Sequence, residues 1–281
     1  MNKTFIQEYV VSSDSDEQRL DIFLAEMMGS SRSAAQKLAK EGLVEISGEV
    51  VAPKQIVTLG EVVSVFKHDP KESPEIPVLF ENEDVLVIDK PSGVTVHPAA
   101  GEKSRTVVEL FDKPLFVVHR LDKGTSGVMI LAKNESTAEF LKKQFADRKV
   151  QKEYLALVVG DITDDQGVIE LDLTRSENTR GNIVPTAEGR KAVTEFTVRE
   201  RYSAYTLISA FPKTGRTHQI RTHLAAIGHP VYGDVRYGSD RGKARIFLHA
   251  QRLSLKLPNT KKAQTWEASL PKELLSILSR F

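Results

Sequence analysis

A polar loop between two apolar runs is the feature that most constrains this chain. Residues 115–118 are hydrophobic, residues 119–127 read H-R-L-D-K-G-T-S-G, and residues 128–132 are hydrophobic again. This alternation predicts a strand, a loop and a second strand. Arg120 and Asp122 therefore lie on a loop that a rigid sheet supports. They form either an ion pair at a hairpin tip or a site with a catalytic carboxylate.

Length and composition allow two or three domains with a sizeable core. The chain has 281 residues, of which 40% are hydrophobic, and domains commonly hold about 100–200 residues. No apolar run reaches the roughly 18 residues of a membrane-spanning helix, and residues 1–10 lack the apolar centre of a signal peptide. The chain has no cysteine, which excludes disulfides and thiolate metal sites. We therefore expect a cytoplasmic protein without a membrane partner.

Changes in residue pattern divide the chain into four segments. Residues 1–18 are polar and acidic, which favours a frayed N-terminal lead-in. Residues 19–66 combine two short helical patterns with small strands, and residues 67–77 hold three prolines, as a linker does. Residues 78–281 carry more strand than helix patterns. There we expect an α+β fold, with a mixed, mainly antiparallel sheet flanked by helices.

Hydrophobic periodicity assigns elements to two further polar segments. Residues 220–227 carry an apolar stripe at helical spacing, which ends at Gly228. Residues 150–159 alternate as a strand does, which places Lys152 and Tyr154 on one face. Taken alone, a tyrosine in a strand is more often a packing residue than a functional one.

Three motifs in this order resemble those of the pseudouridine synthases that act on ribosomal and transfer RNA. They are the loop around Asp122, the string K-E-Y-L-A around Tyr154, and R-T-H-Q-I-R-T-H-L around Arg221. Residues 89–98, D-K-P-S-G-V-T-V-H-P, are similar to the entry to that family's catalytic domain. The resemblance implies an isomerase that converts uridine to pseudouridine in structured RNA, with no metal and no cofactor.

The same resemblance implies roles for individual side chains. Asp122 would be the essential carboxylate, acting on carbon as a nucleophile or on a ribose proton as a base. Arg221 would pair with it, Tyr154 would stack on the target base, and Leu224 would pack under the uracil. Thr222 departs from the family, which more usually has valine there. The other substrate-binding candidates are Arg120, Leu121, Lys152, Lys90 and His97.

These residue types suit the reaction physically. A buried carboxylate without a partner tends to take up a proton, and a neighbouring guanidinium opposes this, ideally through two parallel hydrogen bonds. The uridine must leave its stack at a cost of a few kcal/mol. Stacking on an aromatic ring returns about 1–3 kcal/mol of that cost.

The N-terminal segment resembles the alpha-L RNA-binding module first known from a small-subunit ribosomal protein. The matching strings are R-L-D-I-F-L at 19–24, S-R-S at 31–33 and G-L-V-E-I-S-G at 42–48. The net charge is only +1, yet clustered cations can still meet phosphates. Such cations occur in the second helix of the module, in the long polar loop 175–191, in the third motif and in the stretch 236–256. The RNA-binding candidates are Arg32, Lys37, Lys40, Arg190 and Arg216.

We favour a monomeric synthase that acts on large-subunit ribosomal RNA, with transfer RNA as the second choice. The main alternative is a non-catalytic RNA-binding or ribosome-assembly protein on the same fold. A carboxylate hydrolase ranks third, because it needs a second acid that no motif marks. We expect no metal site at His218, His223 and His229, since spacings of five and six do not place them on one helical face.

Overall fold

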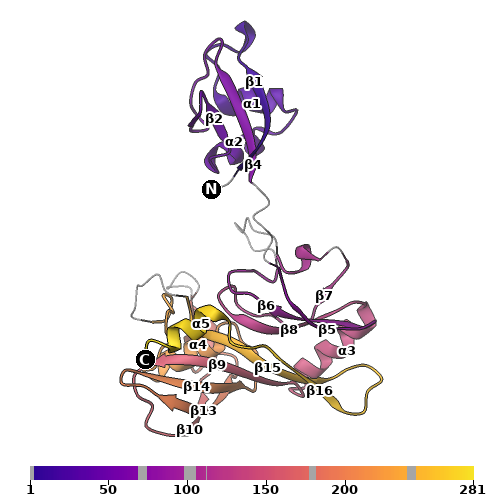
Figure 1. Ribbon diagram of the computed structural model, residues 1–281, viewed down its shortest axis with the longest axis vertical. Coiled ribbons are helices and arrows are strands. Elements are labelled where there is room, and N and C mark those ends of the chain that lie inside the picture. Colours follow the sequence, from indigo (N-terminus) through magenta and orange to yellow (C-terminus); the bar gives the residue numbers. More distant parts are fainter. Residues whose placement is uncertain (1–2, 69–74, 98–105, 112, 177–181, 239–244) are drawn as a thin grey trace. The chain divides into compact units, whose positions relative to one another are not determined.

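The chain separates into two compact units, residues 1–75 and 76–281 (Figure 1). The structure is a computed structural model. It describes residues 3–68, 75–97, 106–111, 113–176, 182–238 and 245–281. Most of the expected linker, 67–77, lies outside the described residues. Its first two residues, Lys67 and His68, instead continue a strand of the first unit. Within the described residues, no helix combines the length and apolar character that crossing a membrane requires.

The first unit packs two helices on a four-stranded antiparallel sheet. Its elements are β1 (Lys3–Val10), a 3₁₀ turn (Ser13–Ser15), α1 (Leu20–Met27), α2 (Arg32–Lys40), β2 (Val44–Ile46), β3 (Glu49–Val50) and β4 (Val62–His68). The apolar stripe of α1, with Phe23 and Leu24, packs against Val63 and Val65 of β4 in one core. Ser31 caps α2 by accepting a hydrogen bond from the Ala34 amide.

Strand β1 corrects the expectation of a frayed lead-in at residues 1–18. It pairs with β4 along its length, from Lys3 opposite His68 to Val10 opposite Val62. β1 is an edge strand with most side chains exposed, so it shows little of the hydrophobic alternation that marks a half-buried strand. Backbone hydrogen bonds to a partner more than fifty residues away order it.

The second unit is built on a ten-stranded sheet with the order β10-β13-β14-β9-β15-β8-β6-β5, to which β16 adds on β15 and β7 on β8. Among the described residues every pairing in this sheet is antiparallel except that of β8 with β15. The expected α+β class and mainly antiparallel sheet are therefore confirmed. The strands are β5 (Val78–Glu81), β6 (Val85–Lys90), β7 (Phe116–Val117), β8 (Ser126–Ala132), β9 (Gln151–Val159), β10 (Gln166–Glu170), β13 (Val193–Arg201), β14 (Tyr205–Pro212), β15 (Leu248–Lys256) and β16 (Ala263–Glu267).

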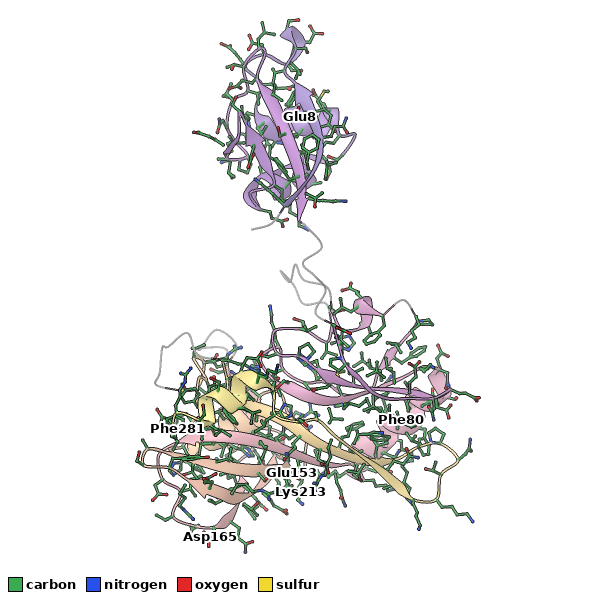
Figure 2. The ribbon with its side chains drawn as sticks, viewed as in Figure 1. Glu8, Phe80, Glu153, Asp165, Lys213 and Phe281 are labelled. Atoms are coloured by element: carbon green, nitrogen blue, oxygen red, sulfur yellow. The ribbon has the colours of Figure 1, made fainter. Side chains whose placement is uncertain are left out.

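Helices α3, α4 and α5 pack on this sheet (Figure 1). Their bounds are α3 (Glu135–Ala146), α4 (Gln219–Ala226) and α5 (Lys272–Leu278), and a 3₁₀ turn covers Val108–Leu110. The chain's single tryptophan, Trp266, is 9% exposed in the core under α3. Its ring centroid lies 5.7 Å from that of Phe80 (Figure 2). Its fluorescence therefore reports on the second unit alone.

The segment 175–191 is not the continuous loop that its polar composition suggested. It holds part of a hairpin, in which β11 (Leu173–Arg175) pairs with β12 (Ile183–Pro185). Residues 177–181, between the two strands in the sequence, lie outside the described residues. Leu173, Ile183 and Ala192 form a small buried cluster. Because these apolar residues are few and widely spaced in the sequence, hydrophobic periodicity does not reveal them.

Gly127 allows the two halves of the large sheet to meet. It is the second residue of the fully buried strand β8 and pairs with Ala250 of β15. Its φ is +116°, and a Cβ built there would lie 2.2 Å from the carbonyl oxygen of Ala250. Only glycine fits such a position. The loop that carries Asp122 therefore ends at a point where both the backbone angle and the available space are fixed.

Replacing Gly127 by alanine should therefore lower the stability of the second unit. We expect Gly127→Ala to cost about 3 kcal/mol or more, from backbone strain together with overpacking. Gly215→Ala is the control, because a Cβ at Gly215 meets no atom within 4 Å, and it should change stability by less than about 0.5 kcal/mol. Urea unfolding followed by Trp266 fluorescence measures both. Equal midpoints for the two variants would contradict this account.

Candidate active site

Asp122 lies on the loop between β7 and β8, and the turn after β6 holds this loop from outside. The Gly93 amide donates to the Lys123 carbonyl at 2.7 Å, and the Ser92 hydroxyl donates to the Gly124 carbonyl at 2.8 Å. The backbone on the C-terminal side of Asp122 is therefore fixed, while its side chain stays 20% exposed. The string D-K-P-S-G thus supports the loop of Asp122 by binding two of its backbone carbonyls.

His119 fixes the start of the same loop. Its Nε2 accepts a hydrogen bond from the Ile130 amide at 3.0 Å, and its ring stacks on Phe145 at 4.7 Å. Burial, with the charge of Lys152 added, lowers the pKa of His119 to about 3. The ring is therefore neutral at physiological pH, with its proton on Nδ1, and Nε2 stays available as an acceptor.

Helix α4 is held at its N-terminal end by Gln219. The side-chain oxygen of Gln219 accepts hydrogen bonds from the Thr214 hydroxyl at 2.7 Å and from the Arg216 amide at 3.0 Å. Its side-chain nitrogen donates to the Val193 carbonyl on β13 at 2.9 Å. One buried amide thus joins the start of the helix to the sheet, which sets the place from which Arg221 extends.

Arg221 contacts Asp122, but its paired hydrogen bonds go to Asp234. Its Nη1 donates to Asp122 Oδ2 at 3.3 Å, whereas Nε and Nη2 donate to the two oxygens of Asp234 at 2.7 and 2.8 Å. Asp234 is fully buried and also accepts from the Arg236 and Tyr237 amides. The expectation of two parallel hydrogen bonds to Asp122 is therefore wrong, because the Nε and Nη2 edge of the guanidinium is already bonded to the buried carboxylate of Asp234.

Both charges of this pair persist in spite of their burial. Burial alone would lower the pKa of Arg221 and raise that of Asp234. Their mutual hydrogen bonds and opposite charges outweigh it, so the pKa of Arg221 lies above its usual value and that of Asp234 below. Sequence reasoning missed Asp234. Its only signal was a Gly-Asp pair after the third motif, and no periodicity links it to the helix.

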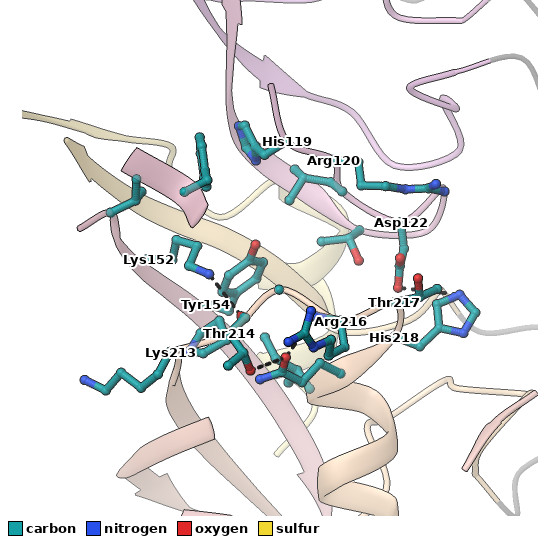
Figure 3. A pocket seen from close by; sticks show the side chains of 18 of the residues that line it. His119, Arg120, Asp122, Lys152, Tyr154, Lys213, Thr214, Arg216, Thr217 and His218 are labelled. Carbon is teal, nitrogen blue, oxygen red and sulfur yellow. Dashed lines mark hydrogen bonds and ion pairs between the residues drawn. The ribbon is translucent and has the colours of Figure 1, made fainter. Parts of the chain in front are cut away.

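A cavity of about 400 Å³ opens beside Asp122. In Figure 3, Lys152 and Tyr154 extend from β9 toward this cavity, and Asp122 enters it from the loop opposite, next to His218. Apolar side chains from three different elements form part of its wall. The lining includes Arg120, Leu121, Asp122, Arg148, Lys152, Tyr154, Arg216, His218, Ile220, Arg221 and Leu248.

Two side chains of β9 have pKa values shifted by this enclosure. Burial, with the charge of Asp122 added, raises the pKa of the Tyr154 phenol, so the ring stays neutral. Burial lowers the pKa of Lys152 to about 8, although its Nζ donates to the Thr214 carbonyl at 3.1 Å. The site therefore combines a carboxylate, a guanidinium, a neutral aromatic ring and an amine that titrates near neutrality.

Six of the nine predicted catalytic and substrate-binding residues line this one cavity, and three do not. Lys90 is completely buried, where its Nζ donates to the carbonyls of Pro91 and Val94, both at 2.9 Å. It therefore braces a turn and does not face RNA as expected; burial lowers its pKa to about 7. Leu224 lies in the core below Ile220, one helical turn away, and Ile220 takes its expected place at the cavity. His97 is exposed and lies outside the lining.

The other two histidines in and near the third motif have protein partners. His223 contacts the Thr194 hydroxyl at 3.0 Å and the Leu171 carbonyl at 2.9 Å, and His229 contacts the Val159 carbonyl at 3.0 Å. In the part of the chain that the structure describes, no group of three or more His, Cys, Asp or Glu side chains is placed to hold a metal. The departure at Thr222 leaves a buried hydroxyl without a partner among the described residues.

The predicted RNA-binding side chains fall into three groups. At the cavity, burial lowers the pKa of Arg216, and the charges of Arg190 and Arg148 lower it further, so three cations lie close together. On α2, Lys37 and Lys40 are exposed. Arg32 is 51% exposed but also donates to the buried carboxylate of Asp21 at 3.1 Å, so only part of it is free for RNA.

The stretch 236–256 does not form one basic surface. Arg245 donates to the Ser126 hydroxyl at 2.6 Å and to Glu273 at 3.0 Å, and Arg236 donates to the side chain of Asn182 at 2.6 Å. Arg241 and Lys243 lie outside the described residues. Much of the charge that the sequence concentrates here therefore serves internal contacts.

Comparison with known proteins adds to this geometry. A family model described as RNA pseudouridylate synthase matches residues 84–226, and a model described as S4 domain matches residues 18–63. An RNA pseudouridine synthase of Aquifex aeolicus is 40% identical over 248 residues, which cover 80% of this chain and 78% of that protein. Ribosomal large subunit pseudouridine synthase C of Haemophilus ducreyi is 35% identical over 98% of this chain and 95% of its own length.

Solved structures agree with these matches. Human RNA pseudouridylate synthase domain containing 1 superposes on this chain with a TM-score of 0.61 and 27% sequence identity. The match covers 72% of this chain and 86% of the human one.

The coupling between Arg221 and Asp234 can be measured with a double-mutant cycle. We expect Arg221→Ala and Asp234→Ala each to cost about 3–5 kcal/mol of stability, because each leaves a buried charge without its main partner. The double variant should cost clearly less than the sum of the two. The surface pair Arg252 and Glu267, with 48% and 57% of the side chains exposed, is the control and should show a coupling below about 1 kcal/mol. Additive losses at Arg221 and Asp234 would refute the interpretation.

Proposed function

The chain belongs to the RNA pseudouridine synthase family, and we propose that it isomerises specific uridines of large-subunit ribosomal RNA, with Asp122 as nucleophile or base. The enzyme class, an isomerase that converts uridine to pseudouridine in RNA, follows from the family. The observation that carries the proposal for the site is the meeting of Asp122, Arg221 and Tyr154 in one cavity. These residues come from three segments that are far apart in the sequence.

The reaction needs no atom beyond those of the substrate. The N1–C1′ bond breaks, the base turns while it is held, and a C5–C1′ bond forms; the C5 proton leaves and N1 gains one. Asp122 starts this sequence by attacking C1′ or by removing the proton of C2′. Arg221 stabilises the negative charge of the carboxylate through a single hydrogen bond from Nη1. This arrangement stabilises the anion and still leaves it able to react.

The cavity walls support the base while it turns. Tyr154 offers a neutral ring for stacking, and Leu121, Ile220 and Leu248 supply apolar wall where the base sits. Arg148 and Arg216 also line the cavity, where they can contact phosphates on either side of a flipped nucleotide. The arrangement suits a nucleotide that has left its stack.

The choice of ribosomal RNA rests on two observations. Residues 18–63 match the S4 domain, and the Haemophilus ducreyi relative, which the chain matches over almost its whole length, is named for the large ribosomal subunit. Exposed lysines on α2 provide a second cationic contact in the first unit. Because the same chain carries both units, a first contact raises the effective concentration of the second on a structured RNA.

Loss of the gene should therefore remove particular pseudouridines from large-subunit ribosomal RNA. We expect the wild-type chain to restore them and Asp122→Asn to restore none, since the amide can neither attack nor take a proton. Mapping pseudouridine in ribosomal and transfer RNA from the three strains tests this. Lys123→Gln, a neighbour outside the cavity lining, is the control and should restore them. Restoration by Asp122→Asn would overturn the role of the carboxylate, and losses confined to transfer RNA would overturn the substrate.

The pKa of Lys152 predicts how RNA affinity depends on pH. With a pKa of about 8 in the free enzyme, the amine loses its charge as the pH rises from 7 to 9. RNA phosphates favour the charged form, so affinity should weaken over this interval by up to about tenfold per pH unit. Lys152→Arg stays charged throughout and should remove this dependence. Fluorescence anisotropy with a labelled ribosomal RNA fragment at constant salt measures it. The same slope in both proteins would contradict the assignment.

A further inference from the structure

His218 has an unusual backbone conformation and lies beside Asp122. It precedes α4 with φ 52° and ψ 19°, a left-handed conformation that only a few per cent of residues other than glycine adopt. This conformation places its ring in the cavity lining, with Nε2 3.9 Å from Asp122 Oδ2 (Figure 3). The fold therefore maintains an uncommon backbone conformation at a residue whose ring lies beside Asp122, as functional sites often do.

The contact with Tyr237 favours one of the two tautomers of the His218 ring. The Tyr237 hydroxyl lies 2.7 Å from His218 Nδ1 and accepts a hydrogen bond from the Ile183 amide of β12 at 3.0 Å. Because that amide already occupies one lone pair of the oxygen, the tautomer in which the hydroxyl donates a hydrogen bond to Nδ1 is the one that also uses the phenol proton. In the neutral ring the remaining proton is then on Nε2, and it faces Asp122.

The surroundings keep the His218 ring neutral. Burial is the main cause that lowers its pKa; Asp122 and, more weakly, Asp234 oppose this, while Arg221 and Arg236 add to it. A neutral ring with its proton on Nε2 donates to a carboxylate without adding a second positive charge to the one that Arg221 supplies. The two residues thus differ in charge but offer the same kind of donor.

One short turn holds both donors. Asp234 binds the guanidinium of Arg221, and Tyr237, three residues later, binds the ring of His218. The turn is closed by a hydrogen bond from the Gly238 amide to the Asp234 carbonyl at 2.7 Å, where a Cβ on residue 238 would not fit. Arg221 also lies over the Tyr237 ring, 5.1 Å from its centroid. The placement of one donor therefore constrains the other.

We propose that His218 is a positioning residue for Asp122, whose Nε2–H joins Arg221 Nη1 on Oδ2 and leaves Oδ1 as the reacting oxygen. Both contacts already point to the same oxygen, at 3.9 and 3.3 Å. The first shortens to a hydrogen bond when a base fills the cavity, as catalytic hydrogen bonds commonly do on substrate binding. The proposal rests on the role proposed above for Asp122. It adds that Tyr237 acts through the histidine by fixing its tautomer.

Two substitutions at position 218 separate a positioning role from a backbone role. The side-chain N–H of glutamine reaches about as far as Nε2, whereas that of asparagine reaches only about as far as Nδ1. Asparagine, however, tolerates the left-handed conformation better than glutamine does. If Nε2–H positions Asp122, His218→Gln should keep kcat within about tenfold of the wild type, and His218→Asn should lose about 100-fold or more. If only the backbone matters, the order reverses.

The role of the tautomer is tested by placing Tyr237→Phe in two backgrounds, one with His218 and one with His218→Gln. Tyr237→Phe should lower kcat about tenfold when His218 is present and should have almost no effect in His218→Gln, because the two act as one unit. Initial rates on large-subunit ribosomal RNA from cells lacking the gene give kcat and KM, and KM should stay within about threefold of the wild type throughout. Urea unfolding followed by Trp266 fluorescence controls for folding.

The outcomes distinguish this inference from the proposed function. Activity of the wild type together with loss in Asp122→Asn upholds the function, whatever happens at position 218. In that setting, an asparagine variant as active as the glutamine variant overturns the positioning role. Equal effects of Tyr237→Phe in the two backgrounds overturn the tautomer argument. An inactive wild type overturns both proposals.

Discussion

The ion pair between Arg221 and Asp234 is the interaction on which the rest of the site depends. A guanidinium paired only with Asp122 would bind both carboxylate oxygens in a tight fork and, if Asp122 reacts as proposed, would reduce their reactivity. Asp234 takes that fork instead and keeps the guanidinium charged and fixed. Asp122 then receives one longer contact, which balances its charge without enclosing it. Asp234 thus holds the cation, which leaves Asp122 for the reaction proposed for it.

The large sheet explains how residues so distant in sequence meet. β8 and β15 form its central parallel pair, and β9 lies on the other side of β15. The register sets Tyr154 of β9 opposite Ala250 of β15, which in turn pairs with Gly127 just after the loop of Asp122, and α4 adds Arg221 to the same cavity. Such a site needs precise strand register more than local helix or loop propensity, since a slip of one residue would turn Tyr154 into the other face.

Sequence analysis was most successful where a short stretch of sequence was enough to determine the local structure. The loop around Asp122 and the alternation of β9 could be read locally, and both match the structure. It failed where partners are distant or are backbone groups. The carbonyls that bind Lys90 come together only when the turn forms. Periodicity placed Leu224 on the correct face of α4 but could not say which turn of the helix meets the cavity.

The close contact at Gly127 has a consequence for how natural variation in this loop should be interpreted. The nine-residue string 119–127 looks like one functional unit, yet Asp122 and Gly127 are constrained for different reasons. If Asp122 reacts as proposed, a change there alters a reacting group on an intact scaffold, so cells would accumulate a full-length, inert protein. A change at Gly127 forces the Ala250 backbone away, so the chain would be degraded before its chemistry mattered. Protein abundance, measured beside RNA modification, would sort inherited variants of this loop into these two kinds.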